Sequence, residues 1–117
     1  MQKYKLIYYE LKNGRRPAEE FIFSQNEKMK GRIGFVVNVL LSEGPNIHMP
    51  YSRAMGNGLY ELRIQAGNNI ARILYFFFDK DKIVLTNGFI KKTQKTPVAE
   101  LERARRYKAD FERRNHQ

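Results

Sequence analysis

The chain has 117 residues, 42% of them hydrophobic, so we expect one folded domain with a small core over residues 1–117. It has no cysteine, which excludes disulfides, thiolate metal sites and cysteine nucleophiles, and no apolar run near the ~20 residues that span a bilayer. The 22 Lys and Arg residues against 12 Asp and Glu give a net charge of +10, which favours a polyanionic partner: nucleic acid, the ribosome or an acidic protein. The charged start of the chain lacks a signal-peptide pattern, so we expect a cytoplasmic protein.

The first half of the chain predicts one strand and two helices. Residues 4–9 are rich in Tyr, Ile and Leu and predict a strand, which an Asn-Gly turn signal follows. Pro17 and the acidic pair after Ala18 predict the first turn of a short helix. A second helix begins after Asn26, a typical N-cap, and stops at Gly44-Pro45. Its apolar stripe consists of Met29, Ile33, Val36, Val37, Leu40 and Leu41.

The second half predicts a strand meander and a final helix. Residues 46–57 read as a loop with room for a short strand near Tyr51. Three strands follow, at 59–64, 70–78 and 83–90, with tight polar turns between them. Thr96 is the expected N-cap of the last helix, with Pro97 at its first position. We therefore expect an α+β domain of order β-α-α-β-β-β-α, with an antiparallel sheet and helices largely on one face.

Charged side chains interrupt the apolar strands of this meander. Glu61 and Arg63 are two residues apart in a strand and so share one face, while their neighbours Leu62 and Ile64 face the helices. Arg72 lies in an otherwise nearly apolar run. A cation in such a strand is costly without a partner, which indicates an anion site, with RNA phosphate as the leading candidate. The alternative is structural: a surface ion pair of Glu61 with Arg63, or an Arg72–Glu61 pair between adjacent strands.

Four phrases in order, PYSR, GLYELR, IARILYFF and GFIKKTQKTP, resemble the RelE/ParE superfamily of toxins, and within it the HigB-type toxins and their phage-derived relatives. The resemblance covers nearly the whole chain. It implies a RelE-like fold and a toxin of a type II toxin–antitoxin system, a metal-independent endoribonuclease that cuts mRNA on the ribosome and needs no cofactor. It also implies a cognate helix-turn-helix antitoxin, through which the complex would bind operator DNA.

The resemblance implies roles for individual residues. Arg72 matches the position that contacts the scissile phosphate, and an arginine fork suits two phosphate oxygens. Glu61 is implied as a base, Arg63 as a phosphate ligand, and Lys92 matches a phosphate-stabilising arginine. We expect Lys91 and Lys92 to point to opposite sides if the last strand continues through them. The residues expected to bind ribosomal RNA are Lys91, Lys95, Arg103, Arg105 and Arg106, and Lys95 could instead contact the antitoxin.

The proton donor is unassigned in the sequence. Some relatives use a histidine near the end of the last strand, where this chain reads Thr86-Asn87-Gly88-Phe89, and Asn87 cannot transfer a proton. His48 falls in a loop, His116 is next to last, and Tyr107 lies late on the final helix. Two other functions therefore stay open. One is a ParE-like toxin that inhibits DNA gyrase without nuclease activity, and the other is a non-toxic phage-derived nucleic-acid-binding protein.

Overall fold

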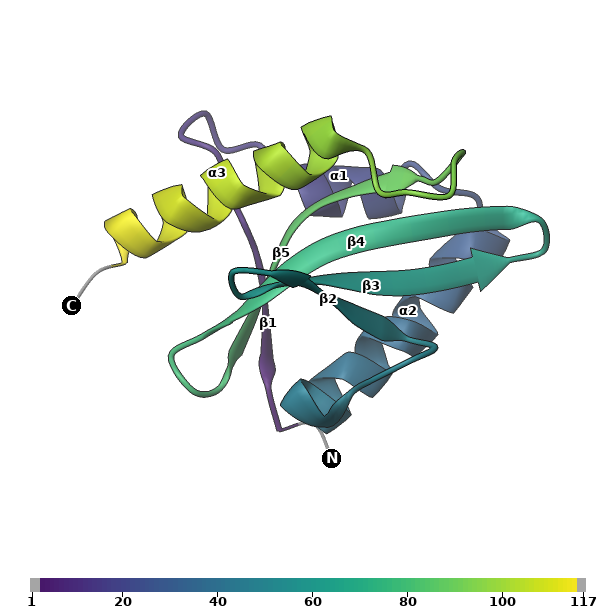
Figure 1. Cartoon of the computed structure of the whole chain (residues 1–117), viewed down its shortest axis with the longest axis horizontal. Helices are drawn as coiled ribbons and strands as arrows, with labels where there is room; N and C mark the ends of the chain where they lie inside the picture. Colours follow the sequence, from purple (N-terminus) through teal and green to yellow (C-terminus); the bar gives the residue numbers. More distant parts are fainter. Residues whose placement is uncertain (1–2, 116–117) are drawn as a thin grey trace.

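The computed structural model describes residues 3–115, in which five strands and three α-helices follow one another in mixed order (Figure 1). The strands are β1 (Lys5–Tyr8), β2 (Ser52–Gly56), β3 (Leu59–Ala66), β4 (Asn69–Phe78) and β5 (Lys82–Ile90). The helices are α1 (Pro17–Phe23), α2 (Glu27–Glu43) and α3 (Val98–Arg114), with a 3-10 turn, η1 (Gly44–Asn46), after α2. The order is thus β-α-α-β-β-β-β-α, one strand more than predicted, because Ser52–Gly56 pairs with β3.

Local signals in the sequence account for the ends of α2. The Asn26 side chain accepts a hydrogen bond of 2.8 Å from the Met29 backbone N–H, which satisfies one of the donors left free at the helix start. Gly44 ends the helix with φ 55°, a backbone conformation that strains most other residues. A side chain at Gly44 would also overlap the ring of Tyr4. Both predicted boundaries of this helix are confirmed.

The five strands form one sheet of order β1-β5-β4-β3-β2. Strands β2 to β5 pair antiparallel, as the meander predicts, but β1 pairs parallel with β5. The prediction of an antiparallel sheet is therefore wrong at this edge, and the sheet is mixed. The physical reason is the long connection through α1 and α2, which returns the chain to β2 at the far edge and leaves β1 beside the last strand.

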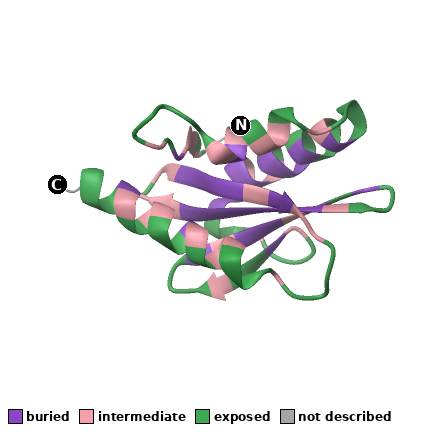
Figure 2. Ribbon diagram, turned by 90° about the horizontal axis from the view of Figure 1, so that it is seen from above, coloured by how far each residue is buried: buried purple, intermediate pink, exposed green. Residues whose placement is uncertain are grey.

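Helices cover both faces of the sheet (Figure 2), so the prediction that they lie largely on one face holds for α1 and α2 and is wrong for α3. The larger core lies between the sheet and the helices α1 and α2. A second core lies under α3, where Ala104 and Phe111 pack with Phe76 and Val84 of the sheet. Within residues 3–115, no helix is long and apolar enough to cross a membrane.

Candidate anion-binding site

The pairing of β3 with β4 places Arg63 directly opposite Arg72. Like charges at opposite positions of neighbouring strands repel each other and destabilise a sheet. Arg63 is half-buried, and its Nη1 donates only to the sulfur of Met49, at 3.1 Å. Among residues 3–115 no carboxylate forms an ion pair with Arg63. The strands therefore hold two guanidinium groups side by side, and among the described residues Glu61, which pairs with Arg72, is the one carboxylate that forms an ion pair with either of them.

Arg72 forms a buried ion pair with Glu61. The Arg72 Nε lies 3.5 Å from the Glu61 carboxylate, and the two side chains are only 6% and 1% exposed. Arg72 Nη1 donates to the Ala71 carbonyl oxygen at 3.0 Å, while its buried Nε makes no hydrogen bond within the described chain. Burial lowers the pKa of Arg72; the charge of Glu61 opposes this shift and that of Arg63 adds to it. The pair fixes the guanidinium in place without satisfying all of its donors.

Thr96 completes this buried group, in a role that the sequence did not indicate. Its hydroxyl donates to the second oxygen of the Glu61 carboxylate. The prediction that Thr96 caps the final helix is therefore wrong: the residue before α3 is Pro97, and no side chain caps the helix. The hydroxyl bonds the carboxylate because Glu61 is buried and needs a second partner.

A cavity of about 470 Å³ lies in front of Arg63 and Arg72. It is lined by Arg63, Ile70, Arg72, Lys91, Lys92, Thr93 and Gln94, four of them cationic and none acidic. The expectation that Lys91 and Lys92 point to opposite sides is not met, because β5 ends at Ile90 and the chain bends into a loop. The backbone N–H of Lys91 still bonds the Ile70 carbonyl oxygen at 2.7 Å, which anchors this loop to β4.

The charges around this cavity act on one another. Burial lowers the pKa of Lys91, and the positive charge of Arg72 lowers it further, as do Arg63 and Arg53, with Glu61 opposing. Arg53 was not among the predicted site residues. It lies opposite Glu61 in the β2–β3 pairing because the register shifts between Ala54 and Gly56; a simple count back from the Asn57-Gly58 turn would have paired it with Leu62, on the other face.

The predicted catalytic residues fall into two groups. Arg63, Arg72 and Lys92 line the cavity together. Glu61 does not line it: its side chain is buried behind Arg72. The structure thus gives Glu61 a position from which it orients Arg72, and no described contact with the open space where a substrate would lie.

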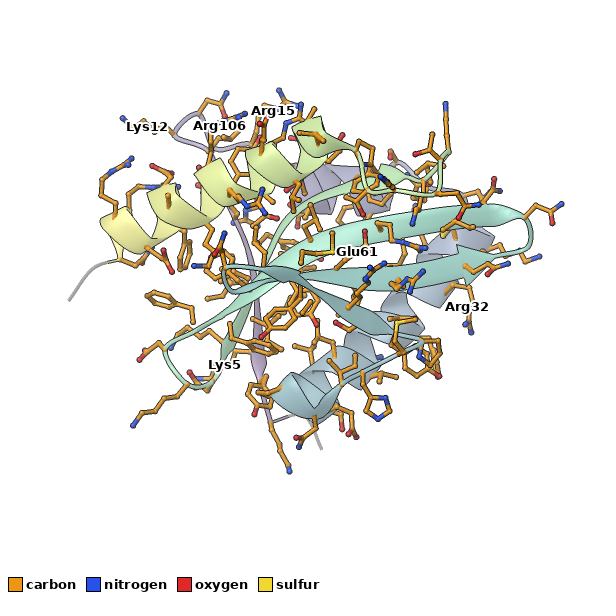
Figure 3. All side chains as sticks on the ribbon, viewed as in Figure 1. Lys5, Lys12, Arg15, Arg32, Glu61 and Arg106 are labelled. Carbon is orange, nitrogen blue, oxygen red and sulfur yellow. The ribbon has the colours of Figure 1, made fainter. Side chains whose placement is uncertain are left out.

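The residues predicted to bind ribosomal RNA do not all lie at this cavity. Lys91 lines it, and Lys95 is exposed on the same loop. Arg103 pairs with Glu100 at 2.9 Å and borders a different hollow, between α1 and α3. Arg105 and Arg106 are exposed on α3, and Figure 3 shows Arg106 near the outer side of that helix, apart from Glu61.

Neither Tyr107 nor His48, the two candidate proton donors that the structure describes, lines the cavity, and Asn87 does not line it either. The amide nitrogen of Asn87 donates to the backbone and side-chain oxygens of Glu100, at 3.2 and 3.0 Å, so Asn87 ties β5 to α3. Tyr107 stacks on Tyr9 with ring centres 4.5 Å apart. His48 is exposed in the loop before β2, and His116 lies outside the described residues. Within residues 3–115 no group of His, Asp and Glu could hold a metal ion.

The arrangement is suited to holding a phosphate. Guanidinium and ammonium groups converge on one open cavity, and a phosphate there would relieve their mutual repulsion.

A search of curated proteins finds no match to this chain. The model of one protein family, described as phage derived protein Gp49-like (DUF891), matches residues 20–109, which include every residue that lines the cavity. Because the match spans more than half of the sequence, the chain belongs to the phage-derived Gp49-like family, which is associated with RelE-like toxins.

Proposed function

We propose that this protein is the toxin of a type II toxin–antitoxin system and that it cleaves mRNA on the ribosome. The observation that carries the proposal is the cavity with four cations and no acid, in which Arg63 lies directly opposite Arg72. Such a cluster is strained by its own charge until an anion enters. Family membership adds support, because Gp49-like proteins are associated with RelE-like toxins.

In the proposed reaction the cations act on the scissile phosphate. Attack of the 2′-oxygen on phosphorus adds negative charge to the phosphate oxygens, and Arg63, Arg72 and Lys92 would stabilise that charge. Glu61 would orient Arg72 from behind, as a positioning residue, in place of the base role implied by the resemblance. The group that accepts the 2′-hydroxyl proton is not among the residues lining the cavity, and the solvent or the ribosome would supply it.

Lys91 is the side chain best placed to protonate the leaving 5′-oxygen. It lines the cavity, and its pKa is lowered by burial and by the neighbouring arginines. A lowered pKa makes an ammonium a better proton donor near neutral pH. Lys91→Arg would keep the charge and lose the donor, because an arginine stays protonated. We expect this variant to bind ribosomes normally and to cleave slowly, with a pH–rate profile that has lost one ionisation.

Expression in a bacterial host without the antitoxin tests the proposal directly. We expect growth arrest, with cuts inside coding regions when a reporter mRNA is mapped by primer extension. Arg63→Ala and Lys92→Ala should each reduce cleavage by about 10²–10³-fold, as is typical when one charge contact of the transition state is lost. Lys12→Ala is a matched control, because it removes an exposed cation elsewhere on the molecule. Intact mRNA together with inhibited DNA supercoiling would overturn the proposal in favour of gyrase inhibition.

The exposed cations outside the cavity would bind ribosomal RNA through its phosphates. Removing Lys95, Arg105 or Arg106 singly should weaken ribosome binding in small steps and lower the salt dependence of binding by about one unit each, less for single-stranded RNA. The cleavage step on bound ribosomes should be unchanged in these variants. An equal loss of binding and cleavage in Lys95→Ala would contradict this division of roles.

The proposed partner is a cognate helix-turn-helix antitoxin, through which the complex would bind operator DNA. The net charge of +10 favours fast association with an acidic segment of that antitoxin. Association should therefore slow as salt is added. An association rate that does not respond to salt would contradict this electrostatic account.

A further inference from the structure

A second cavity, of about 320 Å³, adjoins the cation-lined one. The two cavities share the lining residues Arg63, Ile70 and Arg72. The second cavity is also lined by residues of helix α2 and of the loop before β2. A substrate with its phosphate among the cations could therefore extend a neighbouring group into this space.

The lining of the second cavity adds apolar and aromatic residues to the arginines that it shares with the first. Val36, Pro50 and Ile64 supply apolar surface, and the half-buried ring of Tyr51 supplies an aromatic face. Arg32 and Gln65 add polar groups at its border. A cavity that combines apolar walls and one aromatic ring with the polar groups of Arg32, Arg63, Gln65 and Arg72 suits a flat, partly polar ligand, and its volume falls within the range of small-molecule sites.

Contacts between elements hold these walls in place. The Tyr51 ring packs edge-to-face on Phe35 of α2, with ring centres 6.4 Å apart. The Arg32 Nε donates to the Gln65 carbonyl oxygen at 3.2 Å, which ties α2 to the end of β3. Arg63 bonds the sulfur of Met49 in the loop before β2. These three contacts connect α2, β3 and the loop before β2, which supply the walls of the cavity.

We propose that this cavity is a nucleobase subsite, which takes the base of a nucleotide next to the phosphate held by Arg63 and Arg72. The inference rests on the proposed function. RNA is read mostly as unpaired, splayed bases that stack on aromatic side chains and hydrogen-bond along their edges. Tyr51 supplies the stacking face, and Arg32 and Gln65 supply the polar groups for the base edge. Stacking tolerates every base, so Tyr51 contributes affinity, and the polar pair sets the preference among bases.

The test compares two short RNAs with the purified full chain: an intact oligonucleotide and the same oligonucleotide with the single base removed next to the cleaved phosphate. We expect removal of the base to weaken binding by about 5- to 150-fold, the usual range for one stacked base. Tyr51→Leu should weaken binding of the intact RNA by a similar factor and leave binding of the abasic RNA unchanged. Tyr51→Phe keeps the ring and should bind both RNAs like the unaltered protein.

Gln65→Ala separates a local effect from unfolding, because Gln65 is exposed and its loss leaves the core intact. It should change the preference among RNAs that differ only in that base. Equal binding of intact and abasic RNA would overturn the subsite, and so would equal weakening of both RNAs by Tyr51→Leu. Either result would leave the proposed function standing as long as Arg63→Ala and Lys92→Ala each still reduce cleavage by about 10²–10³-fold. If those variants cleave mRNA normally, the proposed function itself fails.

Discussion

Replacing Arg72 by alanine should cost this protein stability as well as activity. Arg72 and Glu61 are almost fully buried and face each other at 3.5 Å. Without Arg72, Glu61 would keep only its hydrogen bond from Thr96 among its described partners. Removing one partner of a buried ion pair typically costs about 3–5 kcal/mol, because the remaining charge stays in a medium that solvates it poorly. This is a large part of the ~5–15 kcal/mol that stabilises a typical domain.

Urea denaturation followed by circular dichroism measures this effect. We expect Arg72→Ala to lower the free energy of unfolding by about 3–5 kcal/mol. Adding Glu61→Gln to Arg72→Ala should recover part of the lost stability, because it removes the buried carboxylate charge that Arg72 no longer pairs. The double-mutant cycle should give a coupling energy of about 0.5–3 kcal/mol. Arg106→Ala is the matched control, since it removes an exposed arginine and should change stability by less than about 0.5 kcal/mol.

The same variants separate stability from activity. If the Arg72→Ala/Glu61→Gln double variant folds and still fails to cleave mRNA, then the guanidinium acts on the substrate. A loss of less than about 1 kcal/mol in Arg72→Ala would mean that the pair behaves like an exposed ion pair. That result would refute the argument that Glu61 positions Arg72 through a buried contact.

Two further predictions concern packing and pH. A methyl group at Gly88 would lie 2.4 Å from the ring of Phe21, so Gly88→Ala should lower the free energy of unfolding by about 1–3 kcal/mol. Gly34 has open space around it in α2, so Gly34→Ala should raise the free energy of unfolding by about 0.4–1 kcal/mol. Denaturation curves that show no difference between the two variants would contradict this prediction. Burial raises the pKa of both Tyr9 and Tyr75 to about 12, with the Asp110 carboxylate adding to the shift of Tyr9. Because these folded-state values lie above the unfolded value of 10, the stability that they contribute is present below pH 10 and is lost as pH rises toward 12. An ultraviolet titration should show Tyr9 and Tyr75 among the late-ionising tyrosines, and Tyr9→Phe should remove one late ionisation; ionisation of all tyrosines near pH 10 would contradict the prediction.

Much of the local structure can be read from the sequence. Asn26 and the Gly44-Pro45 pair delimit α2, and the apolar runs with polar turns between them delimit β3, β4 and β5. The cationic residues of the site were visible for the same reason: an arginine such as Arg72 stands out in an apolar strand because its burial is costly. Local propensity and burial cost act over a few residues, so one sequence is enough to show them.

The placement of elements far apart in the chain was decided only by the tertiary structure. The nearly continuous apolar run of β4, buried from Ala71 to Phe76, was the available signal that helices cover both faces of the sheet, because a strand with one solvated face alternates. The parallel pairing of β1 with β5 follows from closing one core between the sheet, α1 and α2, which no turn signal encodes. Likewise, the Thr96 hydroxyl bonds the buried Glu61 carboxylate and does not cap α3. Because β5 ends at Ile90, Lys91 and Lys92 line the same cavity. These outcomes depend on which distant groups must share a core, and the sequence determines that only through the folded chain as a whole.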